Sequence, residues 1–437
     1  MVLPQDFITY TRALMGSERY DKMASALLEE PPVSLRLNPF KTLSGITEVC
    51  NADGQVPWAS NGFYLSGRPN FTFDPLFHAG TYYVQEASAM FVAWVASQLI
   101  HAPITMLDLC AAPGGKSTAL RSVLPKGSLL FCNEPMSQRA NILAENVQKF
   151  GHPDMVVTNN FAADYRKSGL QFDVILADVP CSGEGMFRKQ AEAMDYWTPE
   201  YPSQCAALQR EILEQALLML KPGGTLVYST CTWAPEENED IVAWVLEHYP
   251  LTLLEVPKLN GMVPGLSYPE TARMYPQHFR GEGQFVAKFC YEGQETEGKS
   301  RKFKPLKAKV TAEQLKLWQD FAASHLTVTL PGVLQTFGDH LYLLPEGLPD
   351  LGKLRIAHKG LHLGEFKKKR FEPSFALGLA LRPDETVSQV ALSEEQVTRY
   401  LAGETVDLAE DKPNGWYQVV VQGNGLGFAK VTGNVLK

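Results

Sequence analysis

The sequence predicts an α/β fold whose central domain is a mostly parallel, doubly wound sheet. From about residue 104 onward, short apolar runs typical of buried strands alternate with amphipathic helical patterns. Such alternation indicates βαβ units and therefore parallel strands. Three of these strands lead into segments that contain a cysteine, and ligands bind open α/β sheets at the carboxyl ends of the strands. We therefore expect a ligand site at this edge of the sheet.

Each element of the predicted fold has its own pattern. Residues 4–30 predict two short helices, residues 33–38 a strand with Arg36 and Asn38 on one face, and residues 82–99 a helix. In the central domain we expect five strands, at residues 104–109, 128–133, 154–158, 172–177 and 225–230. Helices are expected at residues 117–124, 136–150, 204–220 and 237–248, with a turn at residues 221–224.

The composition excludes several classes of protein. The chain has 437 residues, of which 45% are hydrophobic, and this length suits two or three domains. No apolar stretch approaches the roughly 20 residues of a membrane span, and no signal-peptide segment is recognisable. The seven cysteines form no C-x-x-C pair, which argues against a disulfide framework or a zinc site and favours a reducing, cytoplasmic location. We expect four of them to be buried packing residues, namely Cys50, Cys132, Cys205 and Cys290.

The C-terminal third is more polar and less regular. Residues 292–309 are charged and are interpreted as a linker, residues 310–381 are mixed, and residues 389–437 predict a small β-rich module. The formal net charge of −8 does not indicate a nucleic-acid-binding protein, but two basic runs lie at residues 299–309 and 367–370. Such runs can neutralise phosphates or can equally be solvated loops.

The first strand of the sheet leads into a glycine-rich turn and then a helix. Glycine lets backbone N–H groups approach a ligand closely, and a helix N-terminus favours negative charge. The end of the turn is similar to a P-loop, but that motif needs a glycine where this sequence has Cys110, and a dinucleotide G-x-G-x-x-G is also missing. The pattern favours a ligand bound through ribose, carboxylate and base. Glu134 ends the second strand, where an acidic residue typically accepts hydrogen bonds from ribose hydroxyls.

Two further cysteines follow the ends of later strands. Cys181 and Cys231 come just after apolar β-type runs, and Asp178 precedes Cys181 by three residues. A cysteine nucleophile must be partly ionised, and a neighbouring carboxylate would oppose that ionisation. Asp178 is therefore better suited as an acid or hydrogen-bond partner for a heterocyclic nitrogen. Either cysteine alone could be a packing residue; the repeated pattern beside the glycine-rich turn favours chemistry.

These motifs together resemble a known family. The matching segments are Asp108-Leu109-Cys110-Ala111-Ala112-Pro113-Gly114-Gly115-Lys116, Asp178-Val179-Pro180-Cys181-Ser182-Gly183 and Ser229-Thr230-Cys231. With Gln85-Glu86-Ala87-Ser88 and Arg273-Met274-Tyr275-Pro276 through Gly283-Gln284-Phe285, they resemble the signature set of the Sun family of RNA cytosine-5 methyltransferases, in the same order. The segment 183–189 and the C-terminal module, with its ending Gly427-Phe428-Ala429-Lys430, are most similar to the bacterial RsmF-type 16S ribosomal RNA enzymes.

The resemblance implies a fold and a division of the chain. The fold would be a Rossmann-like S-adenosylmethionine-dependent methyltransferase core, with a small N-terminal α/β RNA-binding region and a C-terminal β-rich PUA-like module. The domains implied are an N-terminal RNA-recognition region (1–75), a methyltransferase catalytic domain (76–291), a linker (292–309), a C-terminal intermediate domain (310–384) and a PUA-like RNA-binding module (385–437).

The resemblance also implies a cofactor and a set of residues that hold it. The methyl donor would be S-adenosylmethionine, bound by Cys110, Ala111, Ala112, Pro113, Gly114, Gly115, Lys116, Glu134, Asn160 and Asp178. Family members usually carry an acidic residue near the adenine, after the third strand. This sequence has Asn159 and Asn160 there, and an amide can still bond the adenine amino group.

The resemblance implies catalytic roles as well. Cys231 matches the family nucleophile, Cys181 the second cysteine linked to product release, and Asp178 would bond N3 of the cytosine. Adding a thiolate to carbon 6 raises the electron density on carbon 5, and the base must be unstacked to be reached. Arg188 or Lys189 could hold the RNA backbone, or both could be ordinary loop cations.

The expected partner is RNA, most of all 16S ribosomal RNA or the small ribosomal subunit, with no metal, no membrane and a monomeric protein. Two alternatives stay open: a transfer RNA cytosine-5 methyltransferase, and a non-catalytic RNA-binding assembly factor on the same scaffold. A P-loop enzyme is disfavoured by Cys110.

Overall fold

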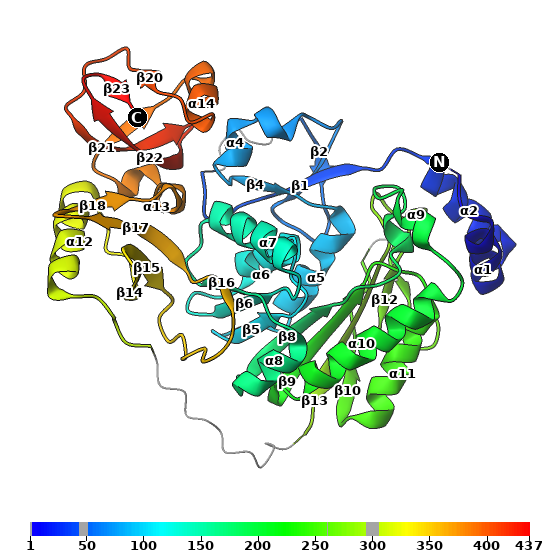
Figure 1. Ribbon diagram of the computed structural model, residues 1–437. Coiled ribbons are helices and arrows are strands. Elements are labelled where there is room, and N and C mark those ends of the chain that lie inside the picture. Colours follow the sequence, from blue (N-terminus) through cyan, green and yellow to red (C-terminus); the bar gives the residue numbers. More distant parts are fainter. Residues whose placement is uncertain (1, 43–50, 260, 294–305) are drawn as a thin grey trace.

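The computed structural model describes residues 2–42, 51–259, 261–293 and 306–437, and it has the α/β architecture that the sequence predicts (Figure 1). Within these residues the central sheet has ten strands, in the order β11-β12-β13-β9-β8-β5-β6-β7-β16, with β10 paired to β13. Its parallel part consists of β5 (Thr105–Asp108), β6 (Leu129–Asn133), β7 (Met155–Thr158), β8 (Phe172–Asp178) and β9 (Leu220–Thr230).

Helices cover both faces of this sheet. Successive residues of each strand point to opposite faces, so each strand contributes side chains to two separate cores. Met106 on β5 belongs to the core under one set of helices, α5 (Ala87–Ser97), α6 (Gly115–Val123) and α7 (Ser137–Phe150). Leu107, the next residue, belongs to the core under the other set, α8 (Ala162–Ser168), α10 (Tyr201–Leu217) and α11 (Glu239–His248). Figure 1 shows the two sets on opposite sides of the sheet.

The structure differs from the predicted elements at several places. The segment expected as one helix divides into β4 (Tyr82–Val84) and α5, because the Glu86 side chain accepts hydrogen bonds from the backbone of Ser88 and Ala89 and so caps the helix. The expected turn at residues 221–224 lies within β9. Helix α8 was not predicted, and neither was the antiparallel half of the sheet, with β10 (Leu251–Leu254), β11 (Val263–Pro264), β12 (Ala272–Met274) and β13 (Gln284–Tyr291).

The N-terminal region packs against two sides of the central domain. Helices α1 (Gln5–Met15) and α2 (Ser17–Leu28) bury Phe7 against Phe187 and Trp197, with ring centroids 5.1 and 5.4 Å apart. A separate sheet in the order β2-β3-β1-β4 lies beside α6 and α7 (Figure 1). Its other strands are β1 (Val33–Leu37), β2 (Ala52–Gln55) and β3 (Gly62–Leu65), and the short helix α4 (Pro75–His78) precedes β4.

The C-terminal region forms two further sheets. The first, after helix α12 (Ala312–His325), consists of β14 (Val333–Phe337), β15 (His340–Leu344), β17 (Leu361–Lys367) and β18 (Arg370–Pro373). After α13 (Phe375–Ala380), the second contains β19 (Gln389–Ala391), β20 (Val406–Asp407), β21 (Gly415–Val421), β22 (Asn424–Thr432) and β23 (Val435–Leu436), with helix α14 (Glu394–Leu401).

The C-terminal region also adds a strand to the central sheet. Strand β16 (Ile356–His358) pairs in antiparallel fashion with β7 at the edge of the central sheet. Most of the predicted linker, residues 294–305, lies outside the described residues, as does Cys50. The domain boundaries stay a prediction. Among the helices of the described chain, none is long and apolar enough to cross a membrane.

Candidate active site

A cavity of about 640 Å³ opens at the carboxyl ends of the parallel strands, at the edge where the sequence predicts a ligand. This volume is within the range of roughly 300–1,000 Å³ that is typical of small-molecule sites. The strand-end segments singled out in the sequence meet here, and five of their members line the cavity: Cys110, Glu134, Asp178, Cys181 and Cys231.

The two cysteines face each other across neighbouring strands. Strands β8 and β9 are parallel and in register, with Asp178 opposite Ser229, so the residues that follow them emerge side by side. The Sγ atoms of Cys181 and Cys231 lie 3.1 Å apart, and the backbone N–H of Cys231 donates to Cys181 Sγ at 3.3 Å. The contact with Cys231 and burial raise the pKa of Cys181 well above its ordinary value. Cys181 is therefore held as a neutral thiol beside Cys231.

Asp178 is fixed at the end of β8 by a cation and a hydroxyl. Lys116 Nζ lies 2.8 Å from Asp178 Oδ2, and Ser229 Oγ donates to Asp178 Oδ1 at 2.5 Å. Gln284 supports Ser229 in turn, because its Nε2 donates to Ser229 Oγ at 3.1 Å. Burial lowers the pKa of Lys116, but its ion pair with Asp178 outweighs burial and leaves this pKa above its ordinary value. The lysine therefore stays charged beside both Asp178 and Cys231.

The glycine-rich turn forms one wall of the cavity. Cys110 and Ala112 line it, whereas Ala111, Pro113, Gly114, Gly115 and Lys116 are not among the lining residues. Gly114 has φ +111°, a conformation that requires glycine, and a Cβ there would lie 3.1 Å from Leu143. Burial raises the pKa of Cys110, so its thiol is not an available nucleophile.

A buried carboxyl lies beneath this turn. Ser117 Oγ donates to Asp108 Oδ2 at 2.6 Å, while Asp108 Oδ1 is buried without a hydrogen-bond partner in the described structure. Burial raises the pKa of Asp108 to about 7. Asp108 does not line the cavity, but the acidic wall at Glu134 fits a ligand that carries hydroxyl and amino groups, as S-adenosylmethionine does.

Glu134 and Asn160 occupy the far end of the cavity from the cysteines. Glu134 is 1% exposed, and its carboxylate accepts from the backbone N–H of Met136 at 3.0 Å and lies 3.4 Å from Arg139 Nη1. The Asn160 amide is already used: Nδ2 donates to Arg355 O and Oδ1 accepts from Arg355 N, both at 3.0 Å. Asn160 lines the cavity, and one N–H and one lone pair of its amide remain for a ligand. Its contact with an adenine stays a prediction.

Two exposed apolar side chains on the cavity wall were missed in the sequence. Met136 follows β6 and is 58% exposed, and Phe161 follows β7 and is 65% exposed. Because both line the cavity, a flat aromatic ligand between them would cover their apolar surface. Their position directly after strands of the predicted sheet was the available signal.

A second group that the sequence did not reveal lies behind Cys181. Ser182 Oγ is within hydrogen-bond distance of Glu184 Oε2, at 2.8 Å, and of Glu237. Ser182 N and Gln209 Nε2 also donate to Glu237, at 3.1 and 2.6 Å. Burial, and then Glu184, raise the pKa of Glu237 to about 8. This polar cluster fixes the turn that carries Cys181.

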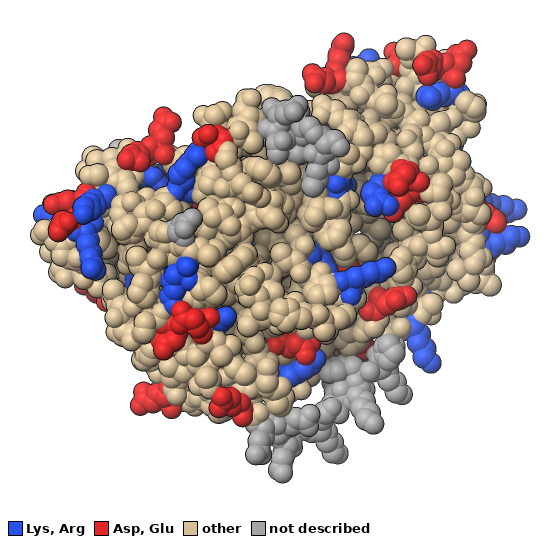
Figure 2. All heavy atoms as spheres, turned by 180° about the vertical axis from the view of Figure 1, so that it is seen from behind, with Lys and Arg blue, Asp and Glu red and all other residues tan. Residues whose placement is uncertain are grey.

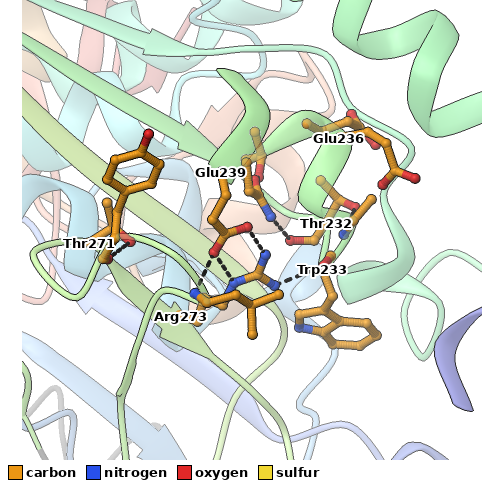
Figure 3. A network of polar contacts seen from close by, with 12 residues as sticks. Thr232, Trp233, Glu236, Glu239, Thr271 and Arg273 are labelled. Atoms are coloured by element: carbon orange, nitrogen blue, oxygen red, sulfur yellow. Dashed lines mark hydrogen bonds and ion pairs between the residues drawn. The ribbon is translucent and has the colours of Figure 1, made fainter. Parts of the chain in front are cut away.

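A buried ion pair fixes the turn that carries Cys231 (Figure 3). Arg273 on β12 forms a two-point ion pair with Glu239 at the start of α11, and its Nε donates to Glu239 Oε1 at 2.8 Å. Arg273 Nη1 donates to the carbonyl oxygen of Trp233, two residues after Cys231, at 2.8 Å. Arg273, which begins one of the segments that resemble the family, is thus a positioning residue and does not line the cavity.

Arg188 is also committed within the protein, contrary to its suggested role as a grip on RNA. It forms a buried ion pair with Glu282 at 2.9 Å and donates to the carbonyl oxygens of Ala26 and Gly281. Lysine, arginine, aspartate and glutamate are interspersed over the face in Figure 2, with no continuous basic region. On this face, contacts to RNA phosphates would have to come from local groups of cations.

Known proteins match the chain along its length. The family models that match are the N-terminal domain of 16S rRNA methyltransferase RsmF (residues 3–87) and 16S rRNA methyltransferase RsmB/F (residues 100–290). The first C-terminal domain of RsmF rRNA methyltransferase matches residues 320–381, and the PUA domain of methyltransferase RsmF matches residues 387–437.

Full-length relatives agree with these matches. The ribosomal RNA small subunit methyltransferase F of Shewanella loihica is 33% identical over 430 residues, which cover 92% of this chain and 87% of that protein. The protein of the same name from Escherichia coli is 30% identical and covers 99% of this chain and 95% of its own length. The chain belongs to the ribosomal RNA small subunit methyltransferase F family. It is therefore an S-adenosylmethionine-dependent methyltransferase that acts on RNA.

Solved structures support the fold. A methyltransferase homologue from Pyrococcus horikoshii is 29% identical, with a TM-score of 0.56 over 63% of this chain and 92% of that one. The structure of NSun6 from Pyrococcus horikoshii with SFG has a TM-score of 0.58 over 67% of this chain and 99% of that one; at 20% identity this likeness concerns the fold alone.

Proposed function

We propose that the protein methylates carbon 5 of a cytosine in RNA through a covalent adduct between Cys231 and carbon 6. The observation that carries this proposal is the contact between the thiols of Cys181 and Cys231, 3.1 Å apart, on the wall of the cavity. Asp178, at the end of β8, lines the same cavity. Carbon 5 of cytosine is a weak nucleophile until a thiolate adds to carbon 6 and places electron density on it.

Each side chain has a separate role in this reaction. Cys231, as a thiolate, forms the S–C6 bond, and the electron pair of the C5–C6 double bond moves onto carbon 5 and, through carbon 4, towards N3. Asp178, held by Lys116 and Ser229, would bond N3 and stabilise the charge that develops there. When bound, S-adenosylmethionine supplies the methyl group that carbon 5 takes up. Loss of the carbon 5 proton then restores the double bond and expels Cys231.

Cys181 is assigned to that last step. Its neutral thiol lies against Cys231, so it can protonate the departing sulfur or guide the base that removes the carbon 5 proton. The cofactor would lie with its ribose at Glu134, its adenine between Met136 and Phe161, and its amino-acid end near Asp178.

The substrate proposed is 16S ribosomal RNA, the substrate in the names of the matching relatives and family models. A transfer RNA enzyme and a non-catalytic assembly factor remain alternatives; the paired thiols favour catalysis over the latter. We propose a cytoplasmic monomer, with residues 1–75 and 385–437 contacting RNA on either side of the catalytic domain.

Adduct trapping tests the proposal. Cys181→Ala should attack RNA and then fail to release it, so a protein–RNA adduct should survive denaturing gel electrophoresis. Cys231→Ala should lose methylation and form no adduct, and the double variant should behave like Cys231→Ala. Cys290→Ala, which changes a cysteine outside the cavity, is the matched control and should resemble the wild type.

Two results would contradict this assignment. An adduct with Cys231→Ala and none with Cys181→Ala would reverse the two roles. Full activity in both variants without any adduct would remove covalent catalysis, and bisulfite sequencing of the treated RNA identifies whether a cytosine is the target.

A further inference from the structure

A second cavity, of about 390 Å³, lies between the N-terminal sheet and α7, on the side of the glycine-rich turn away from the cysteines. It shares no lining residue with the cofactor cavity. Three cations line it, Arg36, Arg68 and Lys149, whereas no aspartate or glutamate does. Aromatic rings and neutral polar groups complete the lining.

Arg36 is the most informative of these cations. It is 2% exposed, and its guanidinium donates to neutral acceptors, among them Gln85 Oε1 at 2.8 Å and Thr118 Oγ1 at 2.7 Å. In the described part of the chain it has no carboxylate partner, and burial lowers its pKa to about 10. A buried charge without a counter-charge is costly, so an anion in the cavity would stabilise it.

The other two cations are similarly without ion pairs among the described residues. Lys149 Nζ lies 3.9 Å from the centre of the Phe77 ring, and the Arg68 guanidinium lies 5.7 Å from that of Phe71. Asp74, close by in the chain, does not line the cavity; its carboxylate accepts from Tyr82 and from the backbone of Leu76. None of the three cations therefore has an ion-pair partner among the described residues, and Glu145, one turn before Lys149 on α7, acts on that lysine only at longer range.

The cavity is built into the fold and connected to the cofactor turn. Arg36 also donates to the carbonyl oxygen of Gly115 at 3.3 Å, and Asn146, another lining residue, donates to that of Pro113 at 2.8 Å. Asn38, directly after the strand that carries Arg36, connects the N-terminal sheet to the end of α7, because its Nδ2 donates to the carbonyl oxygen of Phe150. The cavity is thus lined by residues of the N-terminal region and of α7.

We propose that this cavity binds a phosphate group of the RNA backbone, with the adjoining nucleotide against its aromatic wall. Guanidinium and ammonium groups are the usual partners of phosphate, and bases stack on aromatic side chains. The cavity would hold the substrate at a second point, away from the reacting cytosine. The inference rests on the proposed function for the identity of the ligand as RNA.

The test compares the double variant Arg68→Ala/Lys149→Ala with Lys126→Ala/Arg166→Ala. The control removes the same charge from two exposed residues that precede β6 and β8, at the amino ends of the parallel strands. The probe is fluorophore-labelled small-subunit ribosomal RNA, whose affinity is measured by anisotropy over a range of salt concentrations. Thermal unfolding and calorimetry with S-adenosylmethionine verify that both variants fold and bind the cofactor.

We expect the cavity variant to bind the RNA about tenfold or more weakly, with a salt dependence reduced by about 0.7–0.9 per lost phosphate contact. The control should retain the affinity of the wild type. An affinity and a slope equal to those of the control would overturn the proposal. Loss of binding to inorganic phosphate or AMP with RNA binding unchanged would also overturn it, because the site would then take a small free anion.

The outcome separates this proposal from the proposed function. If the wild type binds RNA through these residues but methylates no cytosine, the proposed reaction fails and the phosphate site stands. If the wild type binds no RNA, both fail.

Discussion

Replacing Glu237 by glutamine should remove a loss of stability that the wild type shows as the pH rises. Ser182 Oγ carries one proton but lies between the buried carboxyl groups of Glu184 and Glu237, so it can donate to only one of them, and both contacts are satisfied when the other carboxyl is protonated and donates to Ser182. The raised pKa of Glu237, about 8 and caused first by burial, agrees with this arrangement. A glutamine has the same shape and can donate to Ser182 Oγ permanently.

The sign follows from proton binding. Between the ordinary pKa of a glutamate, about 4.5, and the raised value of about 8, the folded protein holds a proton that the unfolded chain has released. The free energy of unfolding therefore falls as the pH rises through this window. At roughly 1.4 kcal/mol per pH unit, the wild type should lose about 2–3 kcal/mol between pH 6 and pH 8.

Urea unfolding followed by tryptophan fluorescence at pH 6, 7 and 8 measures this loss. The quantity of interest is the stability of Glu237→Gln relative to the wild type, which should increase with pH. Glu247→Gln, a substitution at an exposed glutamate of α11, is the control and should leave the pH profile unchanged. Parallel profiles for the wild type and Glu237→Gln would refute the protonated state of Glu237.

Two further substitutions probe the cofactor cavity and the turn behind it. Glu134→Ala should weaken S-adenosylmethionine binding in calorimetry by about 1–3 kcal/mol, through lost charged hydrogen bonds, whereas Glu145→Ala on the exposed side of α7 should not; equal affinities would reject the ribose contact. Glu239→Gln should cost about 3–5 kcal/mol in urea unfolding, because it leaves the Arg273 charge buried and unpaired; a loss below 1 kcal/mol would show that the ion pair does not hold the Cys231 turn.

The proximity of Cys181 and Cys231 could be anticipated because it depends on local pattern and topology. Each thiol follows an apolar strand, and adjacent parallel strands end at the same edge, so Cys181 and Cys231 had to emerge near each other. Their 3.1 Å separation and the hydrogen bond between them depend on register, which one sequence does not reveal. The α/β fold was likewise predictable from the alternation of strands and helices.

Other features depend on partners far away in the chain. Asn160 is bonded by Arg355, 195 residues later, and no local pattern signals this pairing. Glu237 reads as an ordinary acidic residue at the start of a helix, yet it is buried against Ser182 from another strand end. Arg188 lies in a glycine-containing loop, and its carboxylate partner Glu282 lies 94 residues later, just before β13.

The pairing of β16 with β7 has a consequence for any attempt to isolate the catalytic domain. Without the C-terminal region, β7 would be an open sheet edge whose N–H and C=O groups could pair with another chain. Residues 155–157 on that edge are apolar and buried, without the charged side chains that guard natural edges. A protein shortened at residue 293 should therefore self-associate, and its insolubility would reflect an uncapped strand rather than a failure of the core to fold.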